Sequence, residues 1–193
     1  MNPVRDELEL KARVDDPAAL EAALVSSGAR LVFRGTMLDR RYDLRGALRA
    51  RDEVLRLRTY RQADGATRGV LAWKGPAGVR DGYKHREEQE TGIADPDVAH
   101  TILTRLGFEV VLRIDRTIAE YAAGAPPGAT VRIEWYPAMD VLVEIEGEPA
   151  AIERAIAVTG LSRERFSAEA LPHFVADFER RTGRAAQLTA DPA

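Results

Sequence analysis

The sequence contains no cysteine and only three histidines among its 193 residues. Without cysteine there can be no disulfide, no thiolate metal site and no thiol nucleophile. The histidines, His85, His100 and His173, lie far apart in the sequence, and isolated histidines are more typical of surface or packing positions than of metal sites. Any bound metal is therefore expected to be a hard cation with oxygen ligands.

Long apolar runs and a strong net charge are also absent. No segment approaches the roughly 18 apolar residues of a membrane-spanning helix, and the N-terminal residues lack the apolar core of a signal peptide. The formal net charge is -3, which argues against a broad basic face for nucleic acid. We expect a cytoplasmic protein that binds neither membranes nor extended nucleic acid. One domain is expected over 1–183, followed by a loose tail over 184–193, which has no periodicity.

One arrangement occurs three times along the chain: two Glu at i and i+2, an acidic residue followed by Pro, and a Gly eleven residues after the Pro. Pro suits the first helical turn, the acidic residue can accept free amide hydrogens, and Gly ends the helix. The pattern predicts helices over 18–27, 97–106 and 150–159, each after a strand. Periodicity predicts a fourth helix from about 167 to 182. Three independent uses of one capping solution explain the recurrence better than an internal duplication.

Several other segments alternate charged and apolar residues, which is typical of strands with one charged and one apolar face. In the segment 54–58, for example, Arg56 and Arg58 alternate with Leu55 and Leu57. Over all predicted strands, the charged faces collect seven acidic and seven basic residues, namely Glu7, Glu9, Glu88, Glu90, Glu134, Glu144, Glu146, Lys11, Arg56, Arg58, Lys74, Lys84, Arg86 and Arg132.

Two interpretations of these charged faces are open. The first is a half-buried sheet whose charged face lies in water, with cross-strand ion pairs that contribute little. The second is a closed antiparallel barrel whose lumen is charged and whose apolar exterior is covered by helices. Glu and Arg dominate the face, and neighbouring like charges cost energy unless a counter-ion is present. A chain of phosphates with a divalent cation would neutralise both sets, which favours the barrel.

An ordered set of motifs runs over about 5–180 of the chain. It consists of Glu7-Leu8-Glu9-Leu10-Lys11, Tyr42-Asp43, Leu55-Arg56-Leu57-Arg58, Trp73-Lys74-Gly75-Pro76, Arg86, Glu88, Glu90, Glu134 and Glu144-Ile145-Glu146-Gly147. With this set, which is more specific than its ExExK motif alone, the chain resembles the CYTH superfamily of triphosphate tunnel metalloenzymes, which includes class IV adenylyl cyclases, thiamine triphosphatases and inorganic triphosphatases.

The resemblance implies an α+β fold: a closed eight-stranded antiparallel β-barrel (tunnel fold) with helices packed outside, which binds a triphosphate with Mg²⁺ or Mn²⁺. The metal ligands that it implies are Glu7, Glu9, Glu134, Glu144 and Glu146, and Glu134 stands where the family usually has Asp. The phosphate contacts that it implies are Lys11, Arg56, Arg58, Lys74, Arg86, Arg116 and Arg132. Among these, Lys11 and Arg58 are the candidate catalytic residues.

The chain departs from the family pattern at two places. Met139-Asp140 replaces the usual Leu-Gly before the last acidic strand, and Ile118 stands where relatives have a further Arg. Arg113 and Arg116 have opposite parity in a regular strand, so only one of them can face the tunnel unless a bulge intervenes.

Three functions follow from the resemblance. The first is hydrolysis of inorganic triphosphate, thiamine triphosphate or a nucleoside triphosphate; the second is cyclisation of ATP to cyclic AMP and pyrophosphate; the third is non-catalytic binding of polyphosphate or a nucleotide. We favour hydrolysis because it needs no base or ribose pocket. Tyr42, Tyr60 and Tyr83, the candidates for adenine stacking, occupy positions more typical of packing. Lys11 is expected to bind phosphate, and a role as general base stays open.

Overall fold

The computed structural model describes the backbone of residues 5–124 and 128–190, and side chains from Leu8 onward. The strands are β1 (Arg5–Val14), β2 (Arg30–Asp43), β3 (Val54–Arg61), β4 (Thr67–Lys74), β5 (Gly78–Arg80), β6 (Tyr83–Ile93), β7 (Glu109–Ala123), β8 (Ala129–Trp135) and β9 (Val141–Glu146). The helices are α1 (Pro17–Ser26), α2 (Ala47–Ala50), α3 (Pro96–Arg105), α4 (Pro149–Thr159), the 3-10 helix η1 (Arg163–Arg165) and α5 (Leu171–Thr182).

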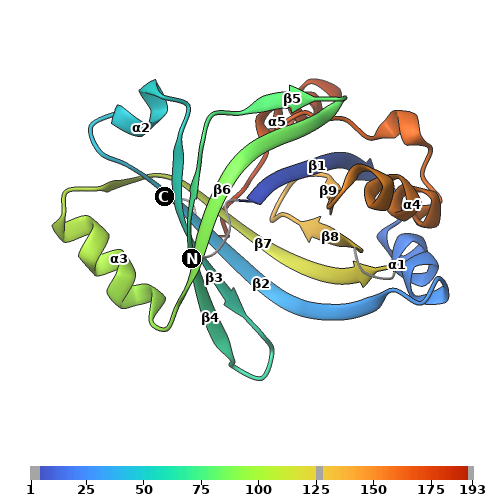
Figure 1. Ribbon diagram of the computed structural model, residues 1–193, viewed down its shortest axis with the longest axis horizontal. Coiled ribbons are helices and arrows are strands. Elements are labelled where there is room, and N and C mark those ends of the chain that lie inside the picture. Colours follow the sequence, from blue (N-terminus) through green and yellow to red (C-terminus); the bar gives the residue numbers. More distant parts are fainter. Residues whose placement is uncertain (1–4, 125–127, 191–193) are drawn as a thin grey trace.

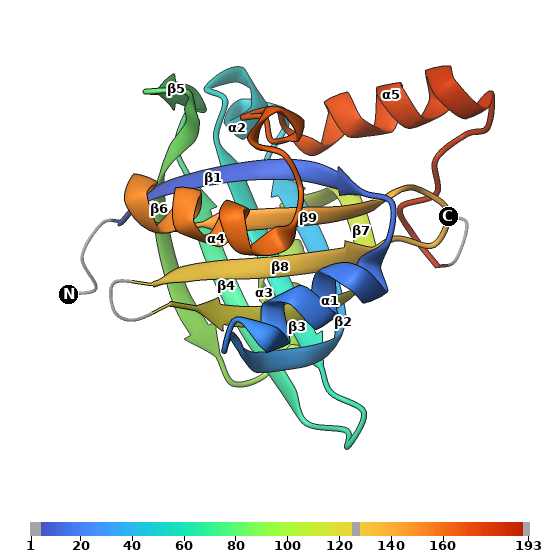
Figure 2. The same cartoon turned by 90° about the vertical axis from the view of Figure 1, so that its right-hand side faces the viewer.

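Eight of the strands pair antiparallel and close into a ring (Figures 1 and 2). The order is β1, β9, β8, β7, β2, β3, β4 and β6, and β6 pairs back onto β1, while β5 pairs with β6 at the side. The ring is uneven, since the β1–β6 pairing spans five residue pairs and β2 pairs with β7 along nearly its whole length. The predicted tunnel-like α+β fold with outer helices is confirmed.

The helices cover the apolar outer face of the ring. Leu24 of α1 and Ile152 of α4 are fully buried against apolar side chains of β1, β8 and β9, such as Ile145, and Figure 2 shows both helices in front of these strands. On the other side, Leu103 of α3 packs on Leu57 of β3. Burial of this outer face leaves the alternate, charged residues pointing inward.

The first three predicted helices begin and end within about two residues of their expected bounds, but their caps differ. Asp16 accepts a hydrogen bond from the amide of Ala19, and Asp95 accepts two amides of α3, both as predicted. The side chain of Glu148 caps no amide of α4, and its backbone carbonyl accepts the amide of Ile152 instead. The recurrent acid–Pro pair is thus a side-chain cap in two helices.

The fourth helix is shorter than predicted, and the tail is not loose over its described part. Ser167 exchanges two backbone hydrogen bonds with Lys11, both 2.9 Å long, so α5 begins at Leu171. Gln187 bridges to Ala138, and the amide of Asp115 donates to the carbonyl of Leu188. Residues 184–190 are therefore docked on the body, whereas 191–193 of the predicted tail lie outside the described residues. No described helix combines the length and apolar character needed to cross a membrane.

Candidate functional site: a charged tunnel

The inner face of the ring buries charged side chains from all eight of its strands. Their solvent-exposed fractions are 9% or less, which is unusual for Lys, Arg and Glu. They are Glu9, Lys11, Asp39, Arg56, Lys74, Glu88, Arg116, Arg132, Glu134 and Glu144. The alternative of a charged sheet face in water is therefore wrong, and the charged faces line the tunnel.

One cluster of the tunnel centres on Lys11 of β1. Its ammonium lies 3.1 Å from Glu9 Oε1 and also contacts the carboxylate of Glu144, which lies directly opposite on β9. Arg132 Nη1 donates to the other oxygen of Glu144 at 2.6 Å, and Arg132 Nη2 donates to Glu120 at 2.9 Å. Each carboxylate of this cluster contacts one or two cations, so the positive and negative charges compensate one another.

A second cluster lies between β2, β3, β7 and β8. Arg58 Nε donates to Asp39 Oδ2 at 3.2 Å, and the guanidinium of Arg116 lies between Asp39, at 3.8 Å, and Glu134, at 3.3 Å. The hydroxyl of Tyr136 donates to Glu134 Oε2 at 2.6 Å. Within the described structure, Asp39 Oδ1 and Glu134 Oε1 are buried and accept no hydrogen bond. Two carboxylate oxygens in the tunnel therefore have acceptor capacity left.

A third group joins β3, β4 and β6. Arg56 Nη2 donates to Glu88 Oε1 at 2.7 Å, and the Lys74 ammonium lies 3.3 Å from Glu88 Oε2. Arg86, also on β6, points to the rim of the ring, where it contacts the carbonyl of Asp52 at 2.6 Å and its carboxylate at 3.1 Å. The tunnel cations thus come from strands far apart in the sequence.

Apolar clusters flank the charged centre along the inner face. Ile114, Arg116 and Ile118 alternate on β7 and share one face. Ile118 packs with Met37 of β2 and Tyr60 of β3, and Ile114 packs with Leu171 of α5. The charged groups are therefore enclosed between apolar layers, which lowers the local dielectric and strengthens their electrostatic interactions.

Neighbouring cations lower the pKa values of three tunnel carboxyls. Burial raises the pKa of Glu9, but the ammonium groups of Lys11 and Lys84 outweigh burial and hold it well below its ordinary value. In the same way, Arg116 and neighbouring cations keep the pKa of Glu134 low, and arginines led by Arg58 keep that of Asp39 low. All three carboxyls are charged at neutral pH.

Lys11 and Tyr136 are shifted mainly by burial. Burial lowers the pKa of Lys11, and the attraction of Glu9 offsets this only in part. Burial and the adjacent Glu134 carboxylate raise the pKa of Tyr136 well above its ordinary value, so its hydroxyl stays protonated and can donate. Lys11 is thus more easily deprotonated than an exposed lysine.

The residues implied by the family resemblance mostly converge in the tunnel. Lys11, Arg56, Arg58, Lys74, Arg116, Arg132, Glu9, Glu134 and Glu144 face it, whereas Arg86 lies at the rim. Glu146 is half-buried and lies directly opposite Glu9. The side chain of Glu7 lies outside the described residues, and only its backbone, opposite Arg86, is placed. On β7, Arg116 is buried and Arg113 is exposed, which settles which of the two faces the tunnel.

The acidic residues do not form a ready metal site. Among the described side chains, no three acids or histidines lie close enough to hold a metal ion. Glu9 and Glu144 instead bind Lys11. The donor chemistry nevertheless fits a hard cation, because the carboxylates are buried and Glu134 Oε1 has no hydrogen bond.

Asp39, Glu120 and Tyr136 are tunnel residues that the sequence reasoning missed. Asp39 and Arg41 stand at i and i+2 in β2, in the same alternation that identified Arg56 and Arg58 on β3. Applying that pattern to β2 would have found Asp39. No signal in the sequence distinguishes Tyr136, which lies one residue beyond the end of β8.

Comparisons with known proteins bear on the fold. No protein-family model and no curated protein sequence matches the chain. Among solved structures, the PH1819 protein of Pyrococcus horikoshii OT3 is 24% identical, with a TM-score of 0.70, and the match covers 89% of this chain and 98% of that one.

Two further solved structures are similar over nearly their full lengths. A candidate adenylate cyclase of Vibrio parahaemolyticus is 19% identical with a TM-score of 0.72, and the match covers 90% of this chain and 99% of that one. A candidate adenylyl cyclase of Hippeastrum, described as having a dominant triphosphatase activity, is 17% identical with a TM-score of 0.63, over 95% and 98% of the two chains. The chain therefore has the fold of these proteins, which is the tunnel fold that the CYTH resemblance implies.

Proposed function

We propose that the chain is a CYTH-type enzyme that hydrolyses a triphosphate with the help of Mg²⁺ or Mn²⁺. The observation that carries the proposal is the convergence of buried cations from different strands, including Lys11, Arg56 and Arg116, on one enclosed tunnel. A triphosphate carries several negative charges on a short chain. Few other small molecules need so many guanidinium and ammonium groups at once.

In the proposed complex, phosphate oxygens replace carboxylates as partners of the tunnel cations. Arg58 and Arg116, which now share Asp39, are placed to donate to phosphate oxygens, as are Arg132 and Lys11 around Glu144. These donors stand on strands of a closed ring. Once phosphate has replaced their carboxylate partners, they would stabilise the charge that develops on the transferred phosphoryl group.

A divalent cation would be held by the tunnel carboxylates Glu9, Glu134 and Glu144, together with Glu7 and Glu146. When bound, it supplies positive charge that polarises a phosphoryl oxygen and helps to position the attacking water. Lys11 binds Glu9 and Glu144 in the described structure, so a cation bound by these two carboxylates would free its ammonium for phosphate. Burial lowers the pKa of Lys11, which favours its second candidate role as general base.

Burial of the tyrosines favours hydrolysis over cyclisation. Tyr42, Tyr60 and Tyr83 have exposed fractions of 2%, 5% and 7%. The hydroxyl of Tyr42 pairs with His100, that of Tyr83 donates to Glu153, and the ring of Tyr60 packs under Arg68 at 4.0 Å. None of these three rings offers an open face for adenine. Cyclisation of ATP is the second candidate function.

The test is a product assay with the purified chain. Tripolyphosphate, thiamine triphosphate and ATP are each incubated with Mg²⁺ or Mn²⁺, and phosphate and cyclic AMP are measured. We expect phosphate from at least one of them and no cyclic AMP. Cyclic AMP with pyrophosphate as the main products would establish the cyclase instead, and tight binding without turnover of any substrate would make the chain a binding module.

A variant tests the metal assignment separately. Glu9→Gln keeps the size of the side chain and removes the charge that a cation needs. We expect it to lose most activity and to require a higher Mn²⁺ concentration for what remains. Full activity at the same metal concentration would refute the role of Glu9.

A further inference from the structure

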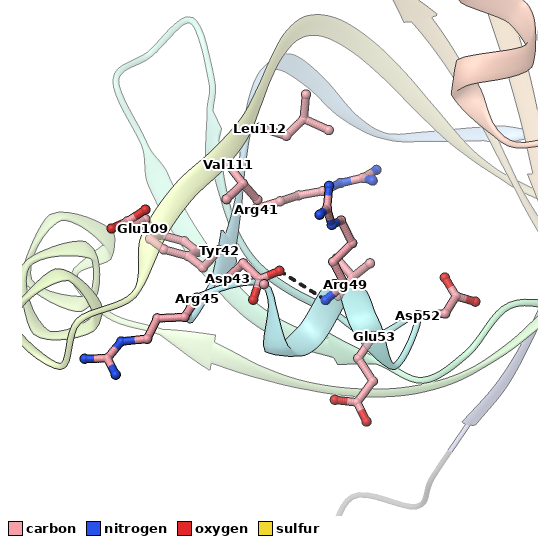
Figure 3. A pocket seen from close by; sticks show the side chains of 12 residues that line it. Arg41, Tyr42, Asp43, Arg45, Arg49, Asp52, Glu53, Glu109, Val111 and Leu112 are labelled. Carbon is pink, nitrogen blue, oxygen red and sulfur yellow. Dashed lines mark hydrogen bonds between the residues drawn. The ribbon is translucent and has the colours of Figure 1, made fainter.

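A pocket of 410 Å³ lies beside α2, and Figure 3 shows the side chains that line it. Its lining includes both arginines and acids, and Arg45 points away from Arg41 and Arg49. The amide of Arg49 donates to the carboxylate of Asp43 at 3.1 Å, which is the dashed line in that figure. Because charges of both signs line this pocket, it favours no single class of ligand.

The tunnel itself contains a buried polar residue, Tyr136, that the proposed function does not use. Tyr136 follows Glu134 by two residues and lies just beyond the end of β8. Its exposed fraction is 8%, and that of Glu134 is 1%. The hydroxyl of Tyr136 donates to Glu134 Oε2 at 2.6 Å. A hydrogen bond to a charged acceptor in such an enclosed place is stronger than the same bond in water.

This hydrogen bond makes the two oxygens of Glu134 different. Oε2 is occupied by the hydroxyl of Tyr136. Oε1 lies 3.3 Å from Arg116 Nε, but it is buried and accepts no hydrogen bond within the part of the chain that the structure describes. Buried polar atoms usually have a partner. Oε1 is therefore the oxygen of Glu134 that has capacity for a further ligand.

The ring of Tyr136 is itself held in place by its surroundings. It belongs to an apolar cluster with Ile114, Leu142 and Leu171, the first residue of α5. The guanidinium of Arg116 also lies over the ring, 5.8 Å from its centroid. Packing of this kind limits the orientations that the phenol can adopt, so the carboxylate accepts from a fixed donor.

We propose that Tyr136 is a positioning residue for the divalent cation of the tunnel. By holding Oε2, it would leave Oε1 as the one oxygen that Glu134 offers to the cation, whereas an unrestrained carboxylate can bind with either or both oxygens. Arg116, which lies near Oε1, would turn to phosphate in the proposed complex. The inference rests on the proposed function for the presence of a cation, and Tyr136 acts only through Glu134.

The experiment measures the binding of Mn²⁺ alone, without substrate, by electron paramagnetic resonance of the free ion. We expect Tyr136→Phe to bind Mn²⁺ at least about tenfold more weakly than the wild type, as is typical when the hydrogen-bond partner of a metal ligand is removed. Tyr83→Phe is the matched control, because the hydroxyl of this buried tyrosine donates to Glu153 of α4 at 2.7 Å. It should keep the affinity of the wild type. Thermal unfolding shows that both variants are folded.

A second variant tests whether Tyr136 acts through Glu134. Once Glu134→Gln has removed the charged ligand, its orientation no longer matters, so adding Tyr136→Phe should weaken Mn²⁺ binding no further. In the activity assay, Tyr136→Phe should raise the Mn²⁺ concentration for half-maximal rate and leave the KM for the phosphate substrate unchanged. A merely structural role would lower stability without changing this dependence on the metal.

Two outcomes overturn the inference alone. One is equal Mn²⁺ affinity of Tyr136→Phe and the wild type, and the other is a further loss of affinity when Tyr136→Phe is added to Glu134→Gln. The proposed function fails in a different way: a wild type that binds no Mn²⁺ would remove the metal from the mechanism, and the inference with it.

Discussion

The Lys11 ammonium lies 3.1 Å from the carboxylate of Glu9, two residues earlier on the same face of β1. Both side chains are buried, with exposed fractions of 7% and 4%. Glu144 contacts the same ammonium from the neighbouring strand. Lys11 and Glu9 of the ExExK motif are therefore part of an enclosed ion network. A phosphate ligand of Lys11 must replace at least one of its carboxylate partners.

Replacing Lys11 should weaken triphosphate binding. We expect Lys11→Gln to lose about 2 kcal/mol of binding free energy for tripolyphosphate, the contribution of a hydrogen bond to a charged group, which is roughly thirtyfold in affinity. Isothermal titration calorimetry of tripolyphosphate into the variant and the wild type measures the difference in affinity. Arg34→Gln is the control, since Arg34 pairs with Glu21 of α1 on the outside of the ring. Equal affinity of Lys11→Gln and wild type would remove Lys11 from the site.

Lys11→Arg separates the two roles of this residue. Arginine keeps the positive charge but does not deprotonate in proteins. If Lys11 only binds phosphate, we expect the variant to retain most of its kcat, with a modest change in KM. A collapse of kcat at unchanged KM would instead identify Lys11 as a general base.

Removing the charge of Asp39 should destabilise the fold. Asp39 is 1% exposed and lies between Arg58 and Arg116. We expect Asp39→Asn to lower the free energy of unfolding by about 3 kcal/mol, because it removes a buried carboxylate that offsets the charge of both arginines. Tripolyphosphate should restore much of the loss, since it supplies negative charge. Urea denaturation with and without the ligand measures both effects, and Asp177→Asn, at an exposed helical pair, is the control.

Stability should fall at acid pH through the tunnel carboxyls. The pKa values of Glu9, Asp39 and Glu134 are lowered in the folded protein, so their contribution to stability is fully present above the unfolded values, about 4 to 4.5. It is lost as the pH falls from there toward the folded pKa values. Urea denaturation between pH 7 and pH 3 should show this loss, with a shallower decline in Glu134→Gln. An equally steep decline in that variant would contradict the shift at Glu134.

The two types of helix cap should differ in their energetic contribution. Asp95 accepts two amides at the start of α3, whereas the side chain of Glu148 accepts none in α4. We expect Asp95→Ala to cost about 1 kcal/mol of stability and Glu148→Ala to cost much less. Thermal unfolding of the two variants checks the difference, and equal losses would refute it.

Much of the architecture was predictable because strand alternation is a strong signal. The charged and apolar faces were assigned correctly for β1, β3 and β9, and the acid–Pro and Gly pattern located three helices. Arg113 and Arg116 have opposite parity on β7, which predicted that only one of them faces inward. The structure shows that this residue is Arg116. These features depend on local spacing, which the sequence contains directly.

Other features depend on long-range contacts that local patterns do not encode. The helix α5 begins at Leu171 rather than at about 167, because Ser167 pairs with the backbone of Lys11, which is far away in the sequence. Residues 184–190 dock through backbone hydrogen bonds to Asp115 and Ala138, although their sequence has no periodicity. The pairing of each tunnel cation with a carboxylate likewise required the closed ring, because partners such as Arg56 and Glu88 come from different strands.

The most direct test of the triphosphate tunnel is a calorimetric titration of tripolyphosphate into the wild type and into Arg58→Gln/Arg116→Gln. These two arginines share Asp39 at the centre of the tunnel. The wild type should bind one tripolyphosphate per chain, with an affinity that falls as salt rises, and the double variant should bind at least about tenfold more weakly. No binding by the wild type, or equal binding by the folded double variant, would contradict the account.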